Sequence, residues 1–231
     1  MKKVEGKVQI SDSIGEISIL SYLPDAPSYI LILGHGAGAG MHHKFMEDLA
    51  LALLELNIGT IRYNFPYMEN KKGRPDVPAV AHKTILQVVK HIAAAHKNVA
   101  LILAGKSFGG RMASQAMAKH RLPNIKGLVF YGFPLHSPAK PGVERAEHLF
   151  EVEVPMLFLQ GSKDNLARID LLEPLLTKLP LASSVIYEGG NHSFRFGKKL
   201  GIDVEKAIAM LASDTKKFLE NKVKFQAKKA N

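Results

Sequence analysis

Short runs of apolar residues recur along the chain and alternate with segments in which apolar residues follow helical spacing. Continuous runs rich in branched side chains are typical of strands buried on both faces of a parallel sheet. The runs predict strands at residues 3–10, 15–23, 29–33, 58–63, 99–104, 127–131, 155–160 and 184–187. The first two flank a Ser11-Asp12-Ser13 turn, which predicts an antiparallel pair at the edge of the sheet.

Apolar side chains three or four residues apart predict helices between these strands. The helices include residues 45–54, 80–92, 112–117, 143–150, 166–179 and 203–219. Residues 64–78 are polar, contain three prolines and are expected to form a loop near a site. The alternation predicts an α/β fold with a mostly parallel central sheet of about seven or eight strands and helices on both faces. The connection at 132–154 is too short for a large cap domain.

The length of 231 residues is compatible with one α/β domain over 1–231, ending in a basic tail at about 221–231. The chain has no cysteine, which excludes disulfides, thiolate metal sites and a cysteine nucleophile. No stretch approaches the roughly 18 apolar residues of a membrane span, and no apolar signal segment follows the first lysines. We therefore expect a cytoplasmic protein.

The formal net charge is +10 at pH 7, which raises the question of a nucleic-acid or membrane partner. Basic residues are scattered along the chain, except for a concentration at 216–229. No nucleic-acid-binding motif accompanies them, so we expect solvated surface charge and no nucleic-acid partner.

A G-x-S-x-G motif, Gly105-Lys106-Ser107-Phe108-Gly109, lies between the strand at 99–104 and the following helix. A sharp strand-to-helix turn of this kind presents the serine hydroxyl above the sheet, and glycines leave the backbone room for it. The pattern alone also fits an ordinary small residue at a strand-helix junction. Its context favours Ser107 as a nucleophile. Lys106 and Arg111 flank Ser107. Either they are solvated or paired with nearby carboxylates, or they favour an acidic acyl substrate.

Two further polar residues follow later strands, in the order Ser, Asp, His. Asp164 follows the strand at 155–160, and His192 follows the strand at 184–187. Since ligands bind at the carboxyl ends of parallel strands, these residues are candidates for one site. His192 would accept the serine proton as general base, and Asp164 would orient the imidazole. Alternatively, Asp164 caps the helix starting near Leu166 and another acid, Asp170 or Glu188, takes its role, or His192 is an ordinary loop histidine.

The glycine-rich loop at 34–40 offers backbone donors for an oxyanion. The N–H of Phe108 is one expected donor, and Ala37, with Gly38 as second choice, is the other. His35 is expected to hold the loop through a backbone hydrogen bond. His42 and His43 lack a partner pair at metal-ligand spacing, so we expect them to be surface residues near a helix start and predict no metal site.

The same loop also satisfies the dinucleotide fingerprint G-x-G-x-x-A, which is an alternative interpretation. That fingerprint requires an acid at the end of the next strand, where this chain has Arg62, Tyr63 and Asn64. An arginine there would suit a 2′-phosphate. The interpretation as a nicotinamide-dependent oxidoreductase nevertheless does not explain why Ser107, Asp164 and His192 follow strands in this order.

Four motifs, HGAGAG at 35–40, GKSFGG at 105–110, GSKDNL at 161–166 and GGNHSF at 189–194, together resemble a small α/β-hydrolase of the dienelactone-hydrolase-like kind. Dienelactone hydrolases use a cysteine nucleophile, whereas this chain has serine. The resemblance therefore implies a serine esterase, acyl-hydrolase or peptidase that acts on a small-molecule acyl substrate without a metal or organic cofactor. The alternative from another class is a non-catalytic binding or scaffold protein with this fold.

Overall fold

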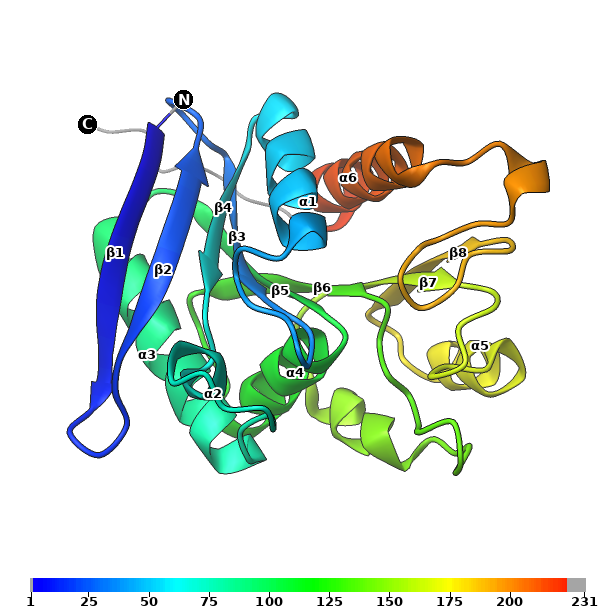
Figure 1. Cartoon of the computed structure of the whole chain (residues 1–231), viewed down its shortest axis with the longest axis horizontal. Coiled ribbons are helices and arrows are strands. Elements are labelled where there is room, and N and C mark those ends of the chain that lie inside the picture. Colours follow the sequence, from blue (N-terminus) through cyan, green and yellow to red (C-terminus); the bar gives the residue numbers. More distant parts are fainter. Residues whose placement is uncertain (1, 224–231) are drawn as a thin grey trace.

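The computed structural model describes residues 2–223, which form an eight-stranded sheet with the strand order β1-β2-β4-β3-β5-β6-β7-β8 (Figure 1). The strands are β1 (Lys2–Ser11), β2 (Gly15–Leu23), β3 (Tyr29–Gly34), β4 (Ile58–Tyr63), β5 (Ala100–Lys106), β6 (Ile125–Tyr131), β7 (Met156–Gly161) and β8 (Ala182–Tyr187). β2 pairs antiparallel with β1 and β4, and all the other pairs are parallel. The predicted α/β fold with an antiparallel edge is confirmed.

Helices cover both faces of the sheet because each parallel connection must cross over one face. They are α1 (Lys44–Glu55), α2 (Pro66–Glu69), α3 (Pro78–Ala95), α4 (Phe108–His120), α5 (Ile169–Leu176), α6 (Val204–Lys222) and the 3-10 helices η1 (Glu144–Glu151) and η2 (Lys198–Leu200). Apolar residues of α1 and α6 pack in one cluster with one face of the sheet. Those of α3, α4, η1 and α5 pack in a larger cluster on the other face.

Some element boundaries differ from the sequence prediction. The helix predicted at 166–179 is shorter at both ends, Ile169–Leu176. Side chains bind the backbone N–H groups that precede its start: Asp164 Oδ1 accepts from Leu166 N at 2.8 Å, and His136 Nε2 accepts from Arg168 N at 3.0 Å. The predicted loop at 64–78 contains the short helix α2, which begins with Pro66. Proline suits a first helical position because it has no N–H to leave unpaired.

The connection between β6 and β7 contains η1 and forms no large cap domain, as predicted. Within residues 2–223, none of the helices has the length and apolar character needed to span a membrane. Of the basic tail expected at 221–231, α6 includes Asn221 and Lys222, and residues 224–231 lie outside the described part of the chain.

The strands β5, β6, β7 and β8 are parallel neighbours in the sheet. Their carboxyl ends therefore lie along one edge of the sheet. Ser107 directly follows β5, Asp164 follows β7, and His192 follows β8. The topology brings these three positions together although 85 residues of chain separate Ser107 from His192.

Candidate active site

Ser107 lies in a strained turn between β5 and α4. Its backbone has φ 49° and ψ −113°, a conformation that non-glycine residues seldom adopt. A Cβ on Gly105 would lie 2.2 Å from the Gly110 nitrogen, and one on Gly109 would lie 2.4 Å from the Gly34 oxygen. Both glycines are therefore needed for the close approach of backbone segments that presents the serine, and strain of this kind is typical of functional sites.

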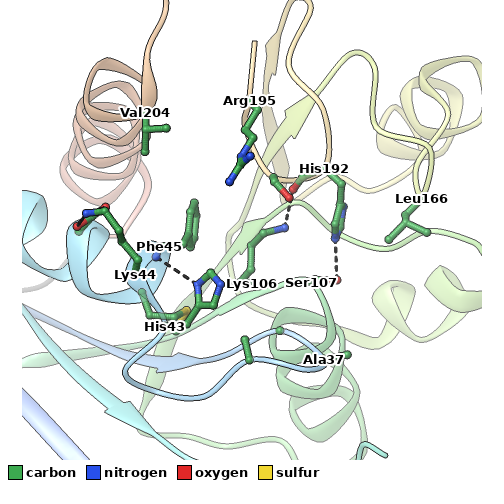
Figure 2. A pocket seen from close by; sticks show the side chains of 15 residues that line it. Ala37, His43, Lys44, Phe45, Lys106, Ser107, Leu166, His192, Arg195 and Val204 are labelled. Atoms are coloured by element: carbon green, nitrogen blue, oxygen red, sulfur yellow. Dashed lines mark hydrogen bonds and ion pairs between the residues drawn. The ribbon is translucent and has the colours of Figure 1, made fainter. Parts of the chain in front are cut away.

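The side chains of Ser107, His192 and Asp164 form one hydrogen-bonded chain, of which Figure 2 shows the contact between His192 and Ser107. His192 Nε2 lies 2.9 Å from Ser107 Oγ, and His192 Nδ1 lies 2.6 Å from Asp164 Oδ2. A carboxylate only accepts hydrogen bonds, so Nδ1 carries the proton that is donated to Asp164. The lone pair of Nε2 is then directed at the serine hydroxyl. This arrangement can remove the serine proton.

Asp164 is 3% exposed and accepts hydrogen bonds from three groups. Besides His192 and the Leu166 N–H, the fully buried Gln160 at the end of β7 donates its Nε2 to Asp164 Oδ2. The Phe133 N–H donates to Gln160 Oε1 at 2.8 Å, which turns the amide nitrogen toward the carboxylate. Gln160 was not predicted from the sequence, in which it is only a polar residue at the end of an apolar run.

The alternative acids lie elsewhere. Asp170 is paired with Arg168 in α5, where its hydrogen bonds with that guanidinium lower the pKa of the carboxyl. Glu188 is an exposed residue just after β8. Asp164 does not cap α5 either, because Arg168 is the residue preceding that helix. Among the weighed acids, the structure brings only Asp164 to His192.

The glycine-rich loop after β3 passes beside Ser107. Gly36 and Ala37 line the same cavity as the serine, whereas Gly38, with φ +71°, is not among the residues that line it. Phe108 is the first residue of α4, and the first N–H groups of a helix have no partner within the helix. The arrangement therefore favours the N–H of Ala37, and not that of Gly38, as the second oxyanion donor beside the N–H of Phe108.

His35 holds this loop, as its sequence position predicts. Its ring is fully buried, with Nδ1 2.9 Å from the Gly36 oxygen and Nε2 accepting from the Phe65 N–H at 3.0 Å. Both contacts suit a neutral imidazole, and burial lowers the pKa of His35 to about 4. The hydroxyl of Tyr67 also donates to the Gly36 oxygen, at 3.3 Å.

The far end of the loop is held at Met41 by two residues from β4 and its continuation. Arg62 Nη1 donates to the Met41 oxygen at 2.9 Å, and the Met41 N–H donates to Asn64 Oδ1 at 2.9 Å. Arg62 is fully buried, and its guanidinium lies 4.5 Å from the centre of the Tyr22 ring. An arginine in this position supports the loop and is not accessible to the 2′-phosphate of a dinucleotide.

A cavity of about 580 Å³ opens above Ser107, within the range typical of small-molecule sites, roughly 300–1,000 Å³. Apolar side chains from several elements form much of its lining: Phe45, Met46, Leu166 and Val204. Charged side chains at the cavity include Lys44, Asp48, Lys106 and Arg195. Lys44 and Asp48 neutralise each other through an ion pair at 2.8 Å.

The two cations that flank the serine in sequence lie in different places. Lys106 lines the cavity, whereas Arg111 lies one turn into α4, where burial and the charge of Arg145 lower the pKa of its guanidinium.

His43, expected to be a surface residue, is exposed. Its side chain accepts a hydrogen bond from the Phe45 N–H at the start of α1, and it also borders the cavity. Within residues 2–223, no three His, Cys, Asp or Glu side chains are grouped so that they could hold a metal ion.

Comparison with solved structures supports the fold. The chain is 20% identical to an alpha-beta serine hydrolase homologue from Coxiella burnetii, with a TM-score of 0.72 over 91% of this chain and 97% of that one. It is 15% identical to a dienelactone hydrolase from Anabaena variabilis, with a TM-score of 0.77 over 96% and 99%. It is 21% identical to an a/b serine hydrolase without lid from Xanthomonas campestris, with a TM-score of 0.71 over 93% and 95%.

The dienelactone-hydrolase-like fold expected from the four motifs is therefore confirmed. The family model described as "Alpha/beta hydrolase domain" matches residues 27–220, most of the chain. These residues contain β3 to β8 and all three members of the Ser107, Asp164, His192 chain. By this match, the chain belongs to the alpha/beta hydrolase family.

Proposed function

We propose that this hydrolase cleaves an ester, thioester or amide of a small-molecule acyl substrate through an acyl-enzyme on Ser107. One observation carries the proposal: the continuous hydrogen-bonded chain from Ser107 Oγ through His192 to Asp164, with steps of 2.9 and 2.6 Å. A serine hydroxyl is a weak nucleophile at neutral pH and needs such a base beside it.

In the first half of the proposed reaction, Ser107 Oγ attacks the acyl carbon while His192 Nε2 takes the hydroxyl proton. Asp164 holds the imidazole in the required tautomer and stabilises its charged form. The oxyanion of the tetrahedral intermediate accepts hydrogen bonds from the N–H groups of Phe108 and Ala37. His192 then gives the proton to the leaving group, and the bond between that group and the acyl carbon breaks.

In the second half, His192 takes a proton from a water molecule, which attacks the acyl-enzyme. Collapse of the second intermediate releases the acid and returns the proton to Ser107. No electron carrier is required by this sequence of steps. The apolar lining of the cavity supports a substrate with an apolar acyl or alcohol part, because such a part leaves water on binding.

A fluorophosphonate probe tests the proposal, because it forms a covalent adduct only with an activated serine. We expect a single adduct by intact mass on the wild type and on Ser184→Ala, which changes an exposed residue of β8, and none on Ser107→Ala. Hydrolysis of p-nitrophenyl acetate should fall by about 10³-fold or more in Ser107→Ala, since loss of a nucleophile removes most of the rate enhancement.

Failure of the wild type to react with the probe, under conditions in which a control hydrolase does react, would favour the non-catalytic scaffold. Undiminished ester hydrolysis by Ser107→Ala would equally contradict the assignment of the nucleophile.

A further inference from the structure

Lys106 is the last residue of β5 and immediately precedes Ser107. Its ammonium group does not extend into bulk solvent. Nζ donates a hydrogen bond of 2.6 Å to the main-chain oxygen of His192, in the loop after β8 (Figure 2). One side chain thus connects the strand that carries Ser107 to the loop that carries His192.

Phe194 of the same loop and two other segments, α1 and the residue after β6, form the slot that holds this ammonium group. Nζ lies 5.9 Å from the ring centre of Phe45 in α1 and 5.6 Å from that of Phe194, and the two rings are stacked with centres 6.1 Å apart. Aromatic faces attract a cation at such distances. Gly132, after β6, has φ +73°, and a Cβ there would lie 3.0 Å from Nζ and 3.3 Å from the His192 oxygen. The absent side chain leaves room for this contact.

Holding an ammonium group in this slot is unfavourable without compensation. Burial lowers the pKa of Lys106 to about 7, although the charge of Asp164 opposes the effect. Among residues 2–223, no carboxylate lies close enough to form an ion pair with Nζ. The hydrogen bond to the His192 carbonyl and the two rings are therefore the interactions that keep the group in place. A neutral amine can still donate this hydrogen bond.

The loop after β8 needs such support, because it has no regular structure between Tyr187 and η2. Its own hydrogen bonds join Asn191 to residues 193–195. These bonds shape the turn. The Gly189 N–H donates to Ser162 Oγ and the Lys163 N–H donates to the Gly190 oxygen, both at 2.8 Å, so the start of the loop is tied to the residues after β7. The Lys106 hydrogen bond ties the main chain of His192 to β5. The imidazole must remain near 3 Å from Ser107 Oγ for proton transfer, and a displacement of about 1 Å can reduce a rate about 100-fold.

We propose that Lys106 is a positioning residue, which holds the main chain of His192 so that the imidazole stays between Asp164 and Ser107. The proposal rests on the function proposed above. It differs from a role in binding an acidic acyl group, in which Nζ would contact the substrate itself and not act through the main chain of His192.

Replacement of the donor tests the proposal. Lys106→Met keeps a long apolar stem and removes the hydrogen bond, and Lys106→Arg keeps a donor. With p-nitrophenyl acetate, we expect kcat of Lys106→Met to fall about 10- to 100-fold with KM changed less than about twofold, and Lys106→Arg to recover most of the loss. Lys90→Met, which removes an exposed lysine of α3, should retain the wild-type kcat.

The substrate charge separates the two possible roles. A positioning role predicts the same loss for a neutral ester and for an ester with a carboxylate on its acyl group. A loss confined to KM for the carboxylate ester would overturn the proposal, as would an unchanged kcat in a folded Lys106→Met variant.

A measurement on the imidazole itself does not depend on turnover. With ¹⁵N-labelled histidine, the Nδ1–H proton resonance of His192, assigned by its loss in His192→Gln, should shift or broaden in Lys106→Met and return in Lys106→Arg. An unchanged resonance in Lys106→Met would contradict positioning even if the enzyme proved inactive. An inactive wild type with the expected resonance changes would instead contradict the proposed function alone. If Lys106→Met does not fold, Lys106→Leu, which also lacks a donor, provides the same comparison.

Discussion

At the scale of single residues, the site depends on how each polar atom is directed by the next one. Gln160 is held by the Phe133 N–H and donates to Asp164, which in turn orients His192 toward Ser107. Every group in this series has a fixed donor or acceptor role. The orientation of the Gln160 amide, and with it the direction of the hydrogen bond to Asp164, therefore follows from the Phe133 backbone N–H at one end of the series.

Replacement of Asp164 by asparagine tests this series. The amide is nearly isosteric but can donate as well as accept, so it permits the tautomer that carries the proton on Nε2. We expect kcat for p-nitrophenyl acetate to fall by about 10³- to 10⁴-fold with little change in the thermal unfolding temperature. Asp170→Asn is the matched control, because Asp170 pairs with exposed Arg168 and has no hydrogen bond to His192 among residues 2–223, so its kcat should stay within about twofold of the wild type. Equal losses in the two variants would contradict the assignment of Asp164.

At the scale of elements, the end of β4 and the residues after it hold the loop after β3 in place through hydrogen bonds. Phe65 and Tyr67 bind the start of that loop at His35 and Gly36, and Arg62 and Asn64 bind its end at Met41. Asn64 is itself held by Glu69 of α2 through a hydrogen bond of 2.9 Å. The supposed loop at 64–78 is therefore a structural support for the proposed oxyanion donor at Ala37.

Asn64→Ala removes the acceptor for the Met41 N–H. We expect the free energy of unfolding to fall by about 1–2 kcal/mol and kcat to fall by up to about 10-fold, because the N–H loses its partner and the loop is held less firmly. Asn70→Ala is the control, since Asn70 bonds to the Pro66 oxygen in the same segment and does not contact the loop end. Urea unfolding and ester hydrolysis measure both effects. A variant with wild-type kcat would show that this contact does not support the donor.

At the scale of the whole molecule, buried His35 and partly buried His148 make stability depend on pH. Burial lowers the pKa of both His35 and His148 to about 4, and neighbouring Arg111 adds to the effect at His148. Between about pH 4 and the ordinary value near 6.5, the unfolded chain binds more protons than the folded one, so stability falls as pH falls. For His35, whose ring is fully buried, the difference corresponds to roughly 3 kcal/mol.

The contribution of His148 can be measured separately, because His148 bonds to Ser114 on the sheet face covered by α4 and does not line the cavity. We expect His148→Gln to lose less unfolding free energy than the wild type between pH 7 and pH 4.5, as measured by urea unfolding. His91→Gln, which changes an exposed residue of α3, should retain the wild-type dependence. Identical pH dependences for the wild type and His148→Gln would contradict a lowered pKa at this position.

The sequence by itself determined the fold class, because apolar runs and helical stripes report which faces of each element are buried. It also indicated Ser107, Asp164 and His192, since each follows a strand in the order typical of α/β-hydrolases. The structure brings the three side chains together, and their catalytic roles stay predictions. Boundaries were less predictable: α5 starts later than its apolar pattern because side chains of Asp164 and His136 bind the N–H groups before it.

Only the tertiary structure decided which residues support these three. Gln160 and Lys106 look in the sequence like polar residues at the ends of apolar strands, and nothing local shows that one reaches Asp164 and the other the His192 carbonyl. Arg62 likewise resembled a candidate ligand residue, yet it is buried against Met41 and Tyr22. The spacing of apolar residues along the chain indicates which face of each helix or strand is buried. Contacts of this kind depend on which strands become neighbours in the sheet, so they are fixed only when the whole chain has folded.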